Sequence, residues 1–205
     1  GDDPDAPTVC AWNTVLIGCD QPLTDDVRTV SIKENTPRIA EKPYIVFKDN
    51  AWYLMKPEEE ENVNGATYKS RQDTEILFDK VYVATPNDNS SSINEKLSAG
   101  THIIFSPGEY TFTEPLIVNQ DNTIIYGMGI PILKMNTDAT DCILVKPGLT
   151  GIRMSSILIQ ATAKSLKSNL LTIGDKGATA NDCYYYDIFT RSGGPDTDPV
   201  GCDTM

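Results

Sequence analysis

Carboxylates gather towards the end of this sequence, beside an arginine that could hold one of them ionised. Hydrolysis of a glycosidic bond needs two positioned carboxyl groups, one serving as the acid and the other as a base or nucleophile. The late carboxylates are Asp182, Asp187, Asp196, Asp198 and Asp203. The candidate catalytic residues are Asp187, Asp196, Asp198 and Arg191. For Asp187 and Arg191, a structural ion pair or turn contact is the favoured interpretation.

Other catalytic chemistries find less support in the sequence. His102 is the only histidine, and because no Gly-x-Ser-x-Gly motif accompanies it, we expect a structural histidine. Neither a phosphate-binding loop nor a dinucleotide fingerprint occurs. A polysaccharide lyase would need clustered basic side chains, whereas those of the later sequence are scattered at Lys134, Lys146, Arg153 and Lys164.

Metal sites are also weakly indicated. Residues 195–199 hold two aspartates at alternate positions, which suits Ca²⁺, but a Pro/Gly-rich stretch of this kind is usually a simple loop. The cysteine spacing matches no zinc pattern. We therefore predict no metal and no cofactor.

The region between residues 92 and 189 repeats itself, and these repeats are the elements that must position any site. Apolar triplets recur at steps of 27 and 28 residues, starting at Leu116, Ile143 and Leu171. A second and a third short apolar run follow each triplet, separated by turns. Three short strands per repeat describe one coil of a parallel β-helix, in which no single repeat can bury its own core.

Two further elements are predicted ahead of the coils. Ser92 to Glu95 has the form of a capping box, and Gly100 is placed to end the short helix that follows. Such a helix would cover the open end of the first coil, where unpaired backbone groups would otherwise meet water. Earlier, residues 44–47 and 51–55 flank a short polar loop and predict a β-hairpin.

These segments carry a resemblance to a known family. The run SINEKLSAGTHIIFSPGEYTF, residues 92–112, resembles the entry to the pectate-lyase-like β-helix superfamily. Residues 81–135 more closely resemble the glycoside hydrolase β-helix family that includes exo-β-1,3-glucanases (laminarinases), and its uncharacterised secreted relatives. EKPYIVFKDNAWYLMKP, residues 41–57, resembles the hairpin of those relatives, and DIFTRSGG, residues 187–194, resembles a motif of their third coil.

The resemblance implies a right-handed parallel β-helix with an N-terminal capping helix and a preceding hairpin. It implies a secreted carbohydrate-active protein that acts on or binds a β-1,3-glucan or related polysaccharide. It also places the catalytic acid on later coils, so this chain alone is expected to lack most of the catalytic set. The expected organisation is an irregular segment at 1–38, the hairpin and a loop at 39–80, and the first coils at 81–205.

Composition is compatible with that class. The chain has 205 residues, 40% of them hydrophobic, and a formal net charge of −12. This acidity argues against nucleic acid and against anionic membrane surfaces as partners. No apolar stretch approaches the roughly 18 residues that span a bilayer, so no membrane insertion is expected.

Five cysteines and one glycosylation sequon bear on the compartment. The disulfide candidates are Cys10, Cys19, Cys142, Cys183 and Cys202. At least one disulfide is expected, consistent with an extracellular or cell-surface location, although five cysteines cannot all pair within one chain. Asn89 heads the only Asn-x-Ser/Thr sequon, so it is the candidate glycosylation site.

The third coil finishes close to Met205 with no capping helix after it. An uncovered coil exposes strand edges, so we expect further β-helix polypeptide to cover this end of an incomplete solenoid. Two hypotheses follow. In the first, the chain is part of a carbohydrate-active enzyme. In the alternative, it is a non-catalytic extracellular solenoid, structural or glycan-binding, that assembles with further chains.

Overall fold

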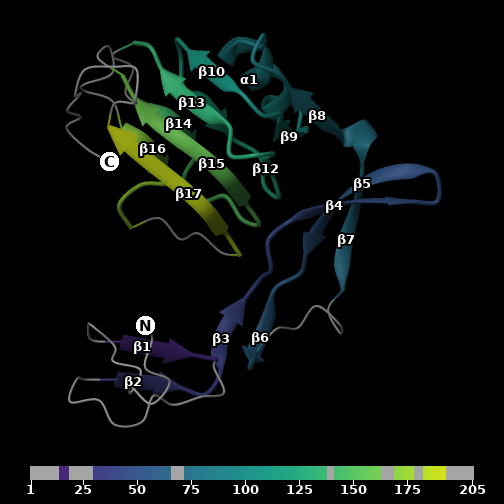
Figure 1. Ribbon diagram of the computed structural model, residues 1–205, viewed down its shortest axis with the longest axis vertical. Coiled ribbons are helices and arrows are strands. Elements are labelled where there is room, and N and C mark those ends of the chain that lie inside the picture. The colour runs from purple at the N-terminus through teal and green to yellow at the C-terminus, as the bar shows by residue number, and fades with distance from the viewer. Residues whose placement is uncertain are drawn as a thin grey trace, which may run out of the picture. The chain divides into compact units, whose positions relative to one another are not determined.

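The computed structural model describes residues 14–18, 30–65, 72–137, 141–162, 169–177 and 182–192. The chain divides into two compact units (Figure 1). One unit comprises residues 1–41 and 57–74, and the other comprises residues 42–56 and 75–205. Each unit is built mainly from β-strands.

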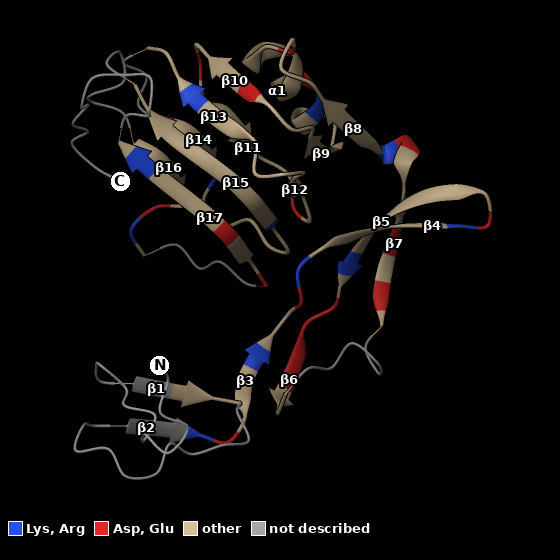
Figure 2. Ribbon diagram, viewed as in Figure 1, with Lys and Arg blue, Asp and Glu red and all other residues tan. Residues whose placement is uncertain are grey.

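The first unit contains two small strand pairs. β1 (Thr14–Ile17) and β2 (Val30–Lys33) are parallel, and β3 (Thr36–Ile39) and β6 (Glu60–Val63) are antiparallel. Figure 2 shows a basic segment of β3 beside an acidic segment of β6, and Arg38 forms ion pairs with Glu59 and Glu61. Exposed ion pairs contribute little, about 0–1 kcal/mol, so these contacts add little to the stability of the unit.

The second unit begins with a β-hairpin. β4 (Tyr44–Lys48) and β5 (Ala51–Pro57) pair antiparallel, and β7 (Asp73–Leu77) extends the sheet in the order β4-β5-β7. The two turn residues, Asp49 and Asn50, both have positive φ angles of 50° and 60°. A type I′ turn requires this conformation, and Asp and Asn tolerate it well. Leu54 of β5 is fully buried and packs with residues of the coils.

The coils of the second unit form two parallel sheets that stack strand on strand (Figure 1). The larger sheet has the order β10-β13-β15-β12-β9-β8, with β17 paired to β15, and the smaller has the order β11-β14-β16. The elements are η1 (Phe78–Lys80), β8 (Val81–Ala84), α1 (Ser90–Ser98), β9 (His102–Phe105), β10 (Glu109–Phe112), β11 (Leu116–Val118), β12 (Ile124–Gly127), β13 (Ile132–Met135), β14 (Asp141–Val145), β15 (Arg153–Ala161), β16 (Asn169–Ile173) and β17 (Tyr184–Ser192).

Strand register confirms the repeat seen in the sequence. Leu116, Ile143 and Leu171 are direct partners in successive strands of the smaller sheet. The second and third runs of each repeat are likewise aligned in the larger sheet. In the second and third coils these two runs merge into single nine-residue strands, β15 and β17, rather than forming the separate strands expected. The chain is therefore a partial parallel β-helix.

α1 lies beside the first coil, and its apolar face joins the core. Ile93 and Leu97 are essentially fully buried in the main cluster. The predicted cap at Ser92 is wrong, because the helix begins one turn earlier. Asn89 is the N-cap, and its Oδ1 accepts a hydrogen bond from the Ser92 backbone N–H at 2.8 Å. None of the helices in the described part of the chain is long and apolar enough to cross a membrane.

Candidate functional site

The candidate site lies at one corner of the coils, where the polypeptide turns between its second and third strand runs. In the second coil a single residue, Ser156, makes this corner, and in the third coil Asp187 does so. Both have positive φ angles, 58° and 49°, so both lie in the left-handed region. In the first coil the corresponding corner is wider and occupies residues 128–131, between β12 and β13.

Gly127 at the end of β12 allows the coils to approach one another at this corner. A Cβ atom at this position would lie 2.0 Å from the backbone oxygen of Ser156. Real Cβ contacts of that length do not occur, so the first coil can carry no side chain here. The glycine and the wider corner together leave space beside Ser156 and Asp187.

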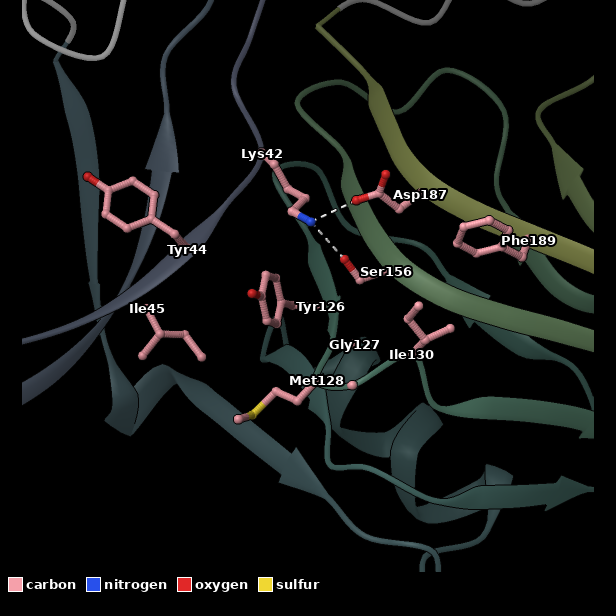
Figure 3. Close-up of a pocket in the computed structure, with 11 residues that line it drawn as sticks. Lys42, Tyr44, Ile45, Tyr126, Gly127, Met128, Ile130, Ser156, Asp187 and Phe189 are labelled. Atoms are coloured by element: carbon pink, nitrogen blue, oxygen red, sulfur yellow. Dashed lines mark hydrogen bonds and ion pairs between the residues drawn. The ribbon is translucent and has the colours of Figure 1, made fainter. Parts of the chain in front are cut away.

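That space is a cavity of about 760 Å³, which we name the Lys42 cavity. Its volume lies within the range of roughly 300–1,000 Å³ that is usual for ligand pockets. Figure 3 shows the hairpin supplying one wall and the coil corners supplying the other. The lining residues are Lys42, Tyr44, Ile45, Tyr126, Gly127, Met128, Gly129, Ile130, Ser156, Asp187 and Phe189.

Lys42 joins the two corner residues of successive coils. Its Nζ donates hydrogen bonds to Asp187 Oδ2 at 2.7 Å and to Ser156 Oγ at 3.0 Å (Figure 3). The side chains of Lys42 and Asp187 are 40% and 55% exposed, so water and ligand hydroxyls can reach both. The cavity therefore offers a cation, a carboxylate and a hydroxyl beside aromatic and aliphatic walls.

This arrangement suits binding better than hydrolysis. Asp187 is the only carboxylate among the lining residues. A glycosidase needs two carboxyl groups, separated by about 5–5.5 Å for retention or about 6.5–9.5 Å for inversion. The described residues of the cavity provide one carboxylate already paired with a lysine. They can hold a polyhydroxylated ligand, but they do not supply an acid and a base together.

Asp187 and Arg191 do not form the expected ion pair. Asp187 pairs with Lys42, whereas Arg191 donates from Nε and Nη2 to Gln160 Oε1 at 3.0 and 2.6 Å. Four residues apart on an extended strand, the two side chains are too widely spaced to meet as they would on a helix. Arg191 is thus a structural link between β17 and β15. Asp196 and Asp198 lie outside the described residues, as does the whole of the 195–199 segment considered above for Ca²⁺.

Asp182 belongs to a separate, buried polar cluster. Arg153 has no exposed surface, and its Nη2 donates to Asp182 Oδ1 at 2.6 Å. Lys56 is 6% exposed, donates to Asn122 Oδ1 at 2.8 Å and lies 4.0 Å from Asp182 Oδ2. The guanidinium of Arg153 also stacks on Tyr184. These contacts tie the hairpin to two coils, and a fully buried Arg153 cannot serve a lyase cleft.

His102 is a structural residue, as predicted. Its Nδ1 accepts a hydrogen bond from the backbone N–H of Ile124 at 3.1 Å, which requires the neutral ring. Burial, together with the nearby positive charges of Lys56 and Lys80, lowers the pKa of His102 to about 4. A histidine held in this way has no free lone pair for catalysis at Nδ1.

The cysteines within the described residues are thiols. Neither Cys142 nor Cys183 takes part in a disulfide, so the expected disulfide is absent at these two positions. Burial raises the pKa of the Cys142 thiol to about 12, and Cys183 Sγ donates to the Leu149 carbonyl at 3.5 Å. Cys10, Cys19 and Cys202 lie outside the described residues. Within the described residues, no group of three or more His, Cys, Asp or Glu side chains could hold a metal ion.

Asp187 is one of the residues predicted from the sequence, whereas Lys42 and Ser156 beside it are not. Lys42 is 145 residues from Asp187 and 114 from Ser156 in the chain. The available signal was the placement of Ser156 and Asp187 at the junctions of aligned runs. Nothing in the local sequence of Lys42 indicated that the chain preceding the hairpin returns to this corner.

A family model, a curated protein and solved structures all match this chain, and they agree on one family. The family model of the LAM55 pectate lyase-like domain matches residues 81–204 of this chain. Among curated proteins, the chain is similar to an exo-beta-1,3-glucanase from Streptomyces sp. (strain SirexAA-E / ActE), with 26% identity over 168 residues. The alignment covers 78% of this chain but 27% of the glucanase. The chain therefore spans about a quarter of the length of that relative.

Solved structures show the same fold. The structure of sacteLam55A from Streptomyces sp. SirexAA-E superposes with a TM-score of 0.79 and 23% identity, covering 89% of this chain and 34% of that one. A variant of the same protein in complex with glucose gives a TM-score of 0.76 and 22% identity over the same shares. These likenesses concern about a third of that protein.

Proposed function

We propose that this chain, which belongs to the LAM55 pectate lyase-like domain family, is a carbohydrate-active protein that binds β-1,3-glucan in the Lys42 cavity. The relative that is 26% identical is an exo-beta-1,3-glucanase, which supports a glycoside-hydrolase-like role connected with this polysaccharide. The single observation that carries the assignment to this cavity is the convergence of Lys42, Ser156 and Asp187 between aromatic walls.

The chemistry of the cavity supports a neutral sugar ligand. A pyranose presents hydroxyl groups at its edge, and it presents an apolar C–H face that packs on aromatic rings. Lys42 can donate to sugar hydroxyls and Asp187 can accept from them, while Tyr126 and Phe189 offer aromatic surface. Because the two charges already neutralise one another, the cavity places no net charge against an uncharged polysaccharide.

The proposed role is binding, with the acid and base of any hydrolysis contributed by polypeptide outside the described residues. The reason is the single carboxylate in the cavity. On this proposal the isolated chain binds linear β-1,3-glucan oligosaccharides and releases no reducing sugar from them.

The test is isothermal titration of the chain with β-1,3-glucan oligosaccharides, compared with β-1,4-linked oligosaccharides of the same length. Lys42→Met should weaken binding about tenfold or more, because a hydrogen bond involving a charged group contributes about 1.5–3 kcal/mol. Phe189→Ala should also weaken binding, through loss of aromatic contact.

Lys134→Met is the matched control. Lys134 pairs with Glu109 at 2.6 Å on strands β13 and β10 and does not line the cavity. This variant should bind as the unaltered chain does. A folded chain that binds no β-1,3-glucan, or a Lys42→Met variant with undiminished affinity, contradicts the proposal.

The alternative is a non-catalytic extracellular solenoid that assembles with further polypeptide, and the last coil provides a specific observation for it. Side chains that are fully buried in the second coil, such as Met154 and Ile157, have register partners Tyr185 and Ile188 that are only partly buried. The Tyr185 hydroxyl is buried without a hydrogen-bond partner among the described residues. A further coil stacked on β17 would complete both features.

We place the protein outside the cell or at its surface, as expected for access to a polysaccharide. Hydrogen exchange tests the further coil: amides of β17 that do not bond to β15 should exchange much faster than those of β15, until a covering polypeptide is added. Equal protection of β17 and β15 in the isolated chain would contradict the need for a cover.

A further inference from the structure

We propose that Asn89 carries an N-linked glycan, a modification that rests on the extracellular location proposed above. Asn89-Ser90-Ser91 is the only Asn-x-Ser/Thr sequon of the chain. Asn89 and Ser91 are both exposed, whereas Ser90 between them is buried. The acceptor amide and the hydroxyl that completes the sequon therefore both face solvent, while the middle residue anchors the segment.

The two polar atoms of the Asn89 side chain have separate uses. Oδ1 accepts the hydrogen bond from the Ser92 N–H that caps α1, at 2.8 Å. Nδ2 donates to no other described residue. Glycosylation modifies Nδ2 and leaves the amide carbonyl in place, so the cap and the glycan are compatible. A glycan on Nδ2 therefore leaves the capping hydrogen bond of the helix intact.

The loop that presents Asn89 is held firmly in place. Asp88 accepts a hydrogen bond from the Tyr82 hydroxyl at 2.5 Å and from the Thr85 backbone N–H at 2.7 Å. These bonds fix the segment between β8 and α1 on both sides of the turn. Asn89 is consequently displayed in one orientation at the surface, next to a strand of the large sheet.

The transfer step needs a donor that the secretory pathway supplies, a lipid-linked oligosaccharide diphosphate. A bond forms between Asn89 Nδ2 and C1 of the first sugar, and the bond between C1 and the phosphate oxygen breaks. The lipid diphosphate leaves with that electron pair, and a base of the transferase takes the amide proton. No oxidant or reductant is involved.

The position suggests what the glycan does. β8 is the last strand in the order of the large sheet, so one of its edges has no strand partner among the described residues. Figure 1 shows β8 and α1 at the same end of the coils. Exposed strand edges favour pairing between molecules, and bulky groups beside them prevent it. A glycan on the adjoining loop would shield the β8 edge.

The experiment is translation of the chain behind a secretion signal into endoplasmic-reticulum microsomes, which supply the donor whether or not secretion succeeds. The expected product carries a mass excess that peptide-N-glycosidase removes, converting Asn89 to aspartate in the peptide map. Two variants separate the cap from the sequon. Asn89→Asp keeps an N-capping side chain and removes the acceptor, whereas Ser91→Ala keeps Asn89 intact and breaks the sequon.

Both variants should lack the mass excess, and Asn89→Asp should unfold at about the same urea concentration as Ser91→Ala, which keeps the Asn89 cap. An unmodified product in microsomes that glycosylate a standard acceptor, or a mass excess that persists in Asn89→Asp, overturns the proposal. Deglycosylated protein should also aggregate faster at high concentration, and an unchanged rate overturns the shielding role. Glucan binding is measured separately, so a glycan without glucan binding would count against the proposed function alone.

Discussion

Ser156 of β15 and Asp187 of β17 occupy the same position in successive coils, and both adopt a left-handed backbone conformation. Their neighbours on either side remain paired across the two strands, so each residue forms a one-residue corner in an otherwise continuous ladder. Lys42 binds both side chains. The repeat therefore aligns two residues with strained backbone conformations. Lys42, just before the hairpin, hydrogen-bonds to the side chains of both.

Gly127→Ala should destabilise the chain more than Gly148→Ala, a substitution at a coil glycine with open space around it. The added methyl would meet the Ser156 backbone oxygen at 2.0 Å, so the coils must shift apart. We expect a loss of about 3 kcal/mol, measured by urea unfolding, in line with overpacked sites. Gly148→Ala is the control: it has φ of +77° and open space, so only the backbone cost of about 1–2 kcal/mol applies. Equal losses in the two variants would contradict the close approach.

Lys42 and Asp187 should couple weakly, and Asp187 and Arg191 should not couple at all. The first pair is exposed and bonded at 2.7 Å, which predicts a coupling energy of about 0.2–1 kcal/mol. Arg191 instead binds Gln160. Double-mutant cycles by urea unfolding, with Lys42→Met, Asp187→Asn and Arg191→Met, measure both energies. A larger coupling energy between Asp187 and Arg191 than between Asp187 and Lys42 would contradict the pairing seen in the structure.

Asp182→Asn should be more destabilising than Arg153→Leu. Removing the carboxylate leaves a fully buried guanidinium without its counter-charge, for which we expect a cost of about 3 kcal/mol. Replacing Arg153 by an apolar side chain removes the buried charge itself, and the partly exposed Asp182 can be solvated. Thermal or urea unfolding of the two variants and their combination decides the order. The reverse order would mean that the hydrogen bonds and packing lost with Arg153 outweigh the cost of leaving its charge unpaired.

Acid should destabilise the protein through His102. Its pKa is about 4 in the folded chain, below the usual 6.5, because burial and nearby lysines disfavour the charged ring. The unfolded chain therefore binds the proton first, and stability falls as pH drops from about 6.5 to 4. The total loss corresponds to about 3 kcal/mol.

His102→Asn separates this effect from the titration of carboxylates. An asparagine oxygen can accept the Ile124 N–H in place of Nδ1, but it does not titrate. Urea unfolding between pH 7 and 4 should show a shallower decline for the variant than for the unaltered chain. Parallel declines would show that His102 does not control acid stability.

The coils and their register could be predicted from the sequence because they depend on local spacing. Triplets at Leu116, Ile143 and Leu171 must be aligned if their apolar side chains are to share one core, and the strands pair at those residues. The helix start was misplaced because Asn89 and Ser92 are both good capping residues, and local sequence does not decide between them. In the structure α1 begins at Ser90, so Asn89 is the cap and the Ser92 hydroxyl donates to the Asn89 carbonyl.

The candidate site was predicted only in part. Asp187 stood out as a late carboxylate, but its partner was sought at Arg191, within the same strand. Side chains four apart on a strand do not meet, so the partner had to come from another element, and it came from Lys42. Composition predicts at least one disulfide among the five cysteines, and the two that lie within the described residues, Cys142 and Cys183, are thiols.

The repeat spacing is enough to predict the solenoid, because a repeat that cannot bury its core alone must stack on its neighbours. The position and the lining of the cavity depend instead on how distant segments fold together. Its walls come from segments far apart in the chain, and no local pattern encodes a contact of that range. Whether Ser156 and Asp187 face a ligand depends on Gly127, whose missing side chain lets the coils close up and leaves room beside them.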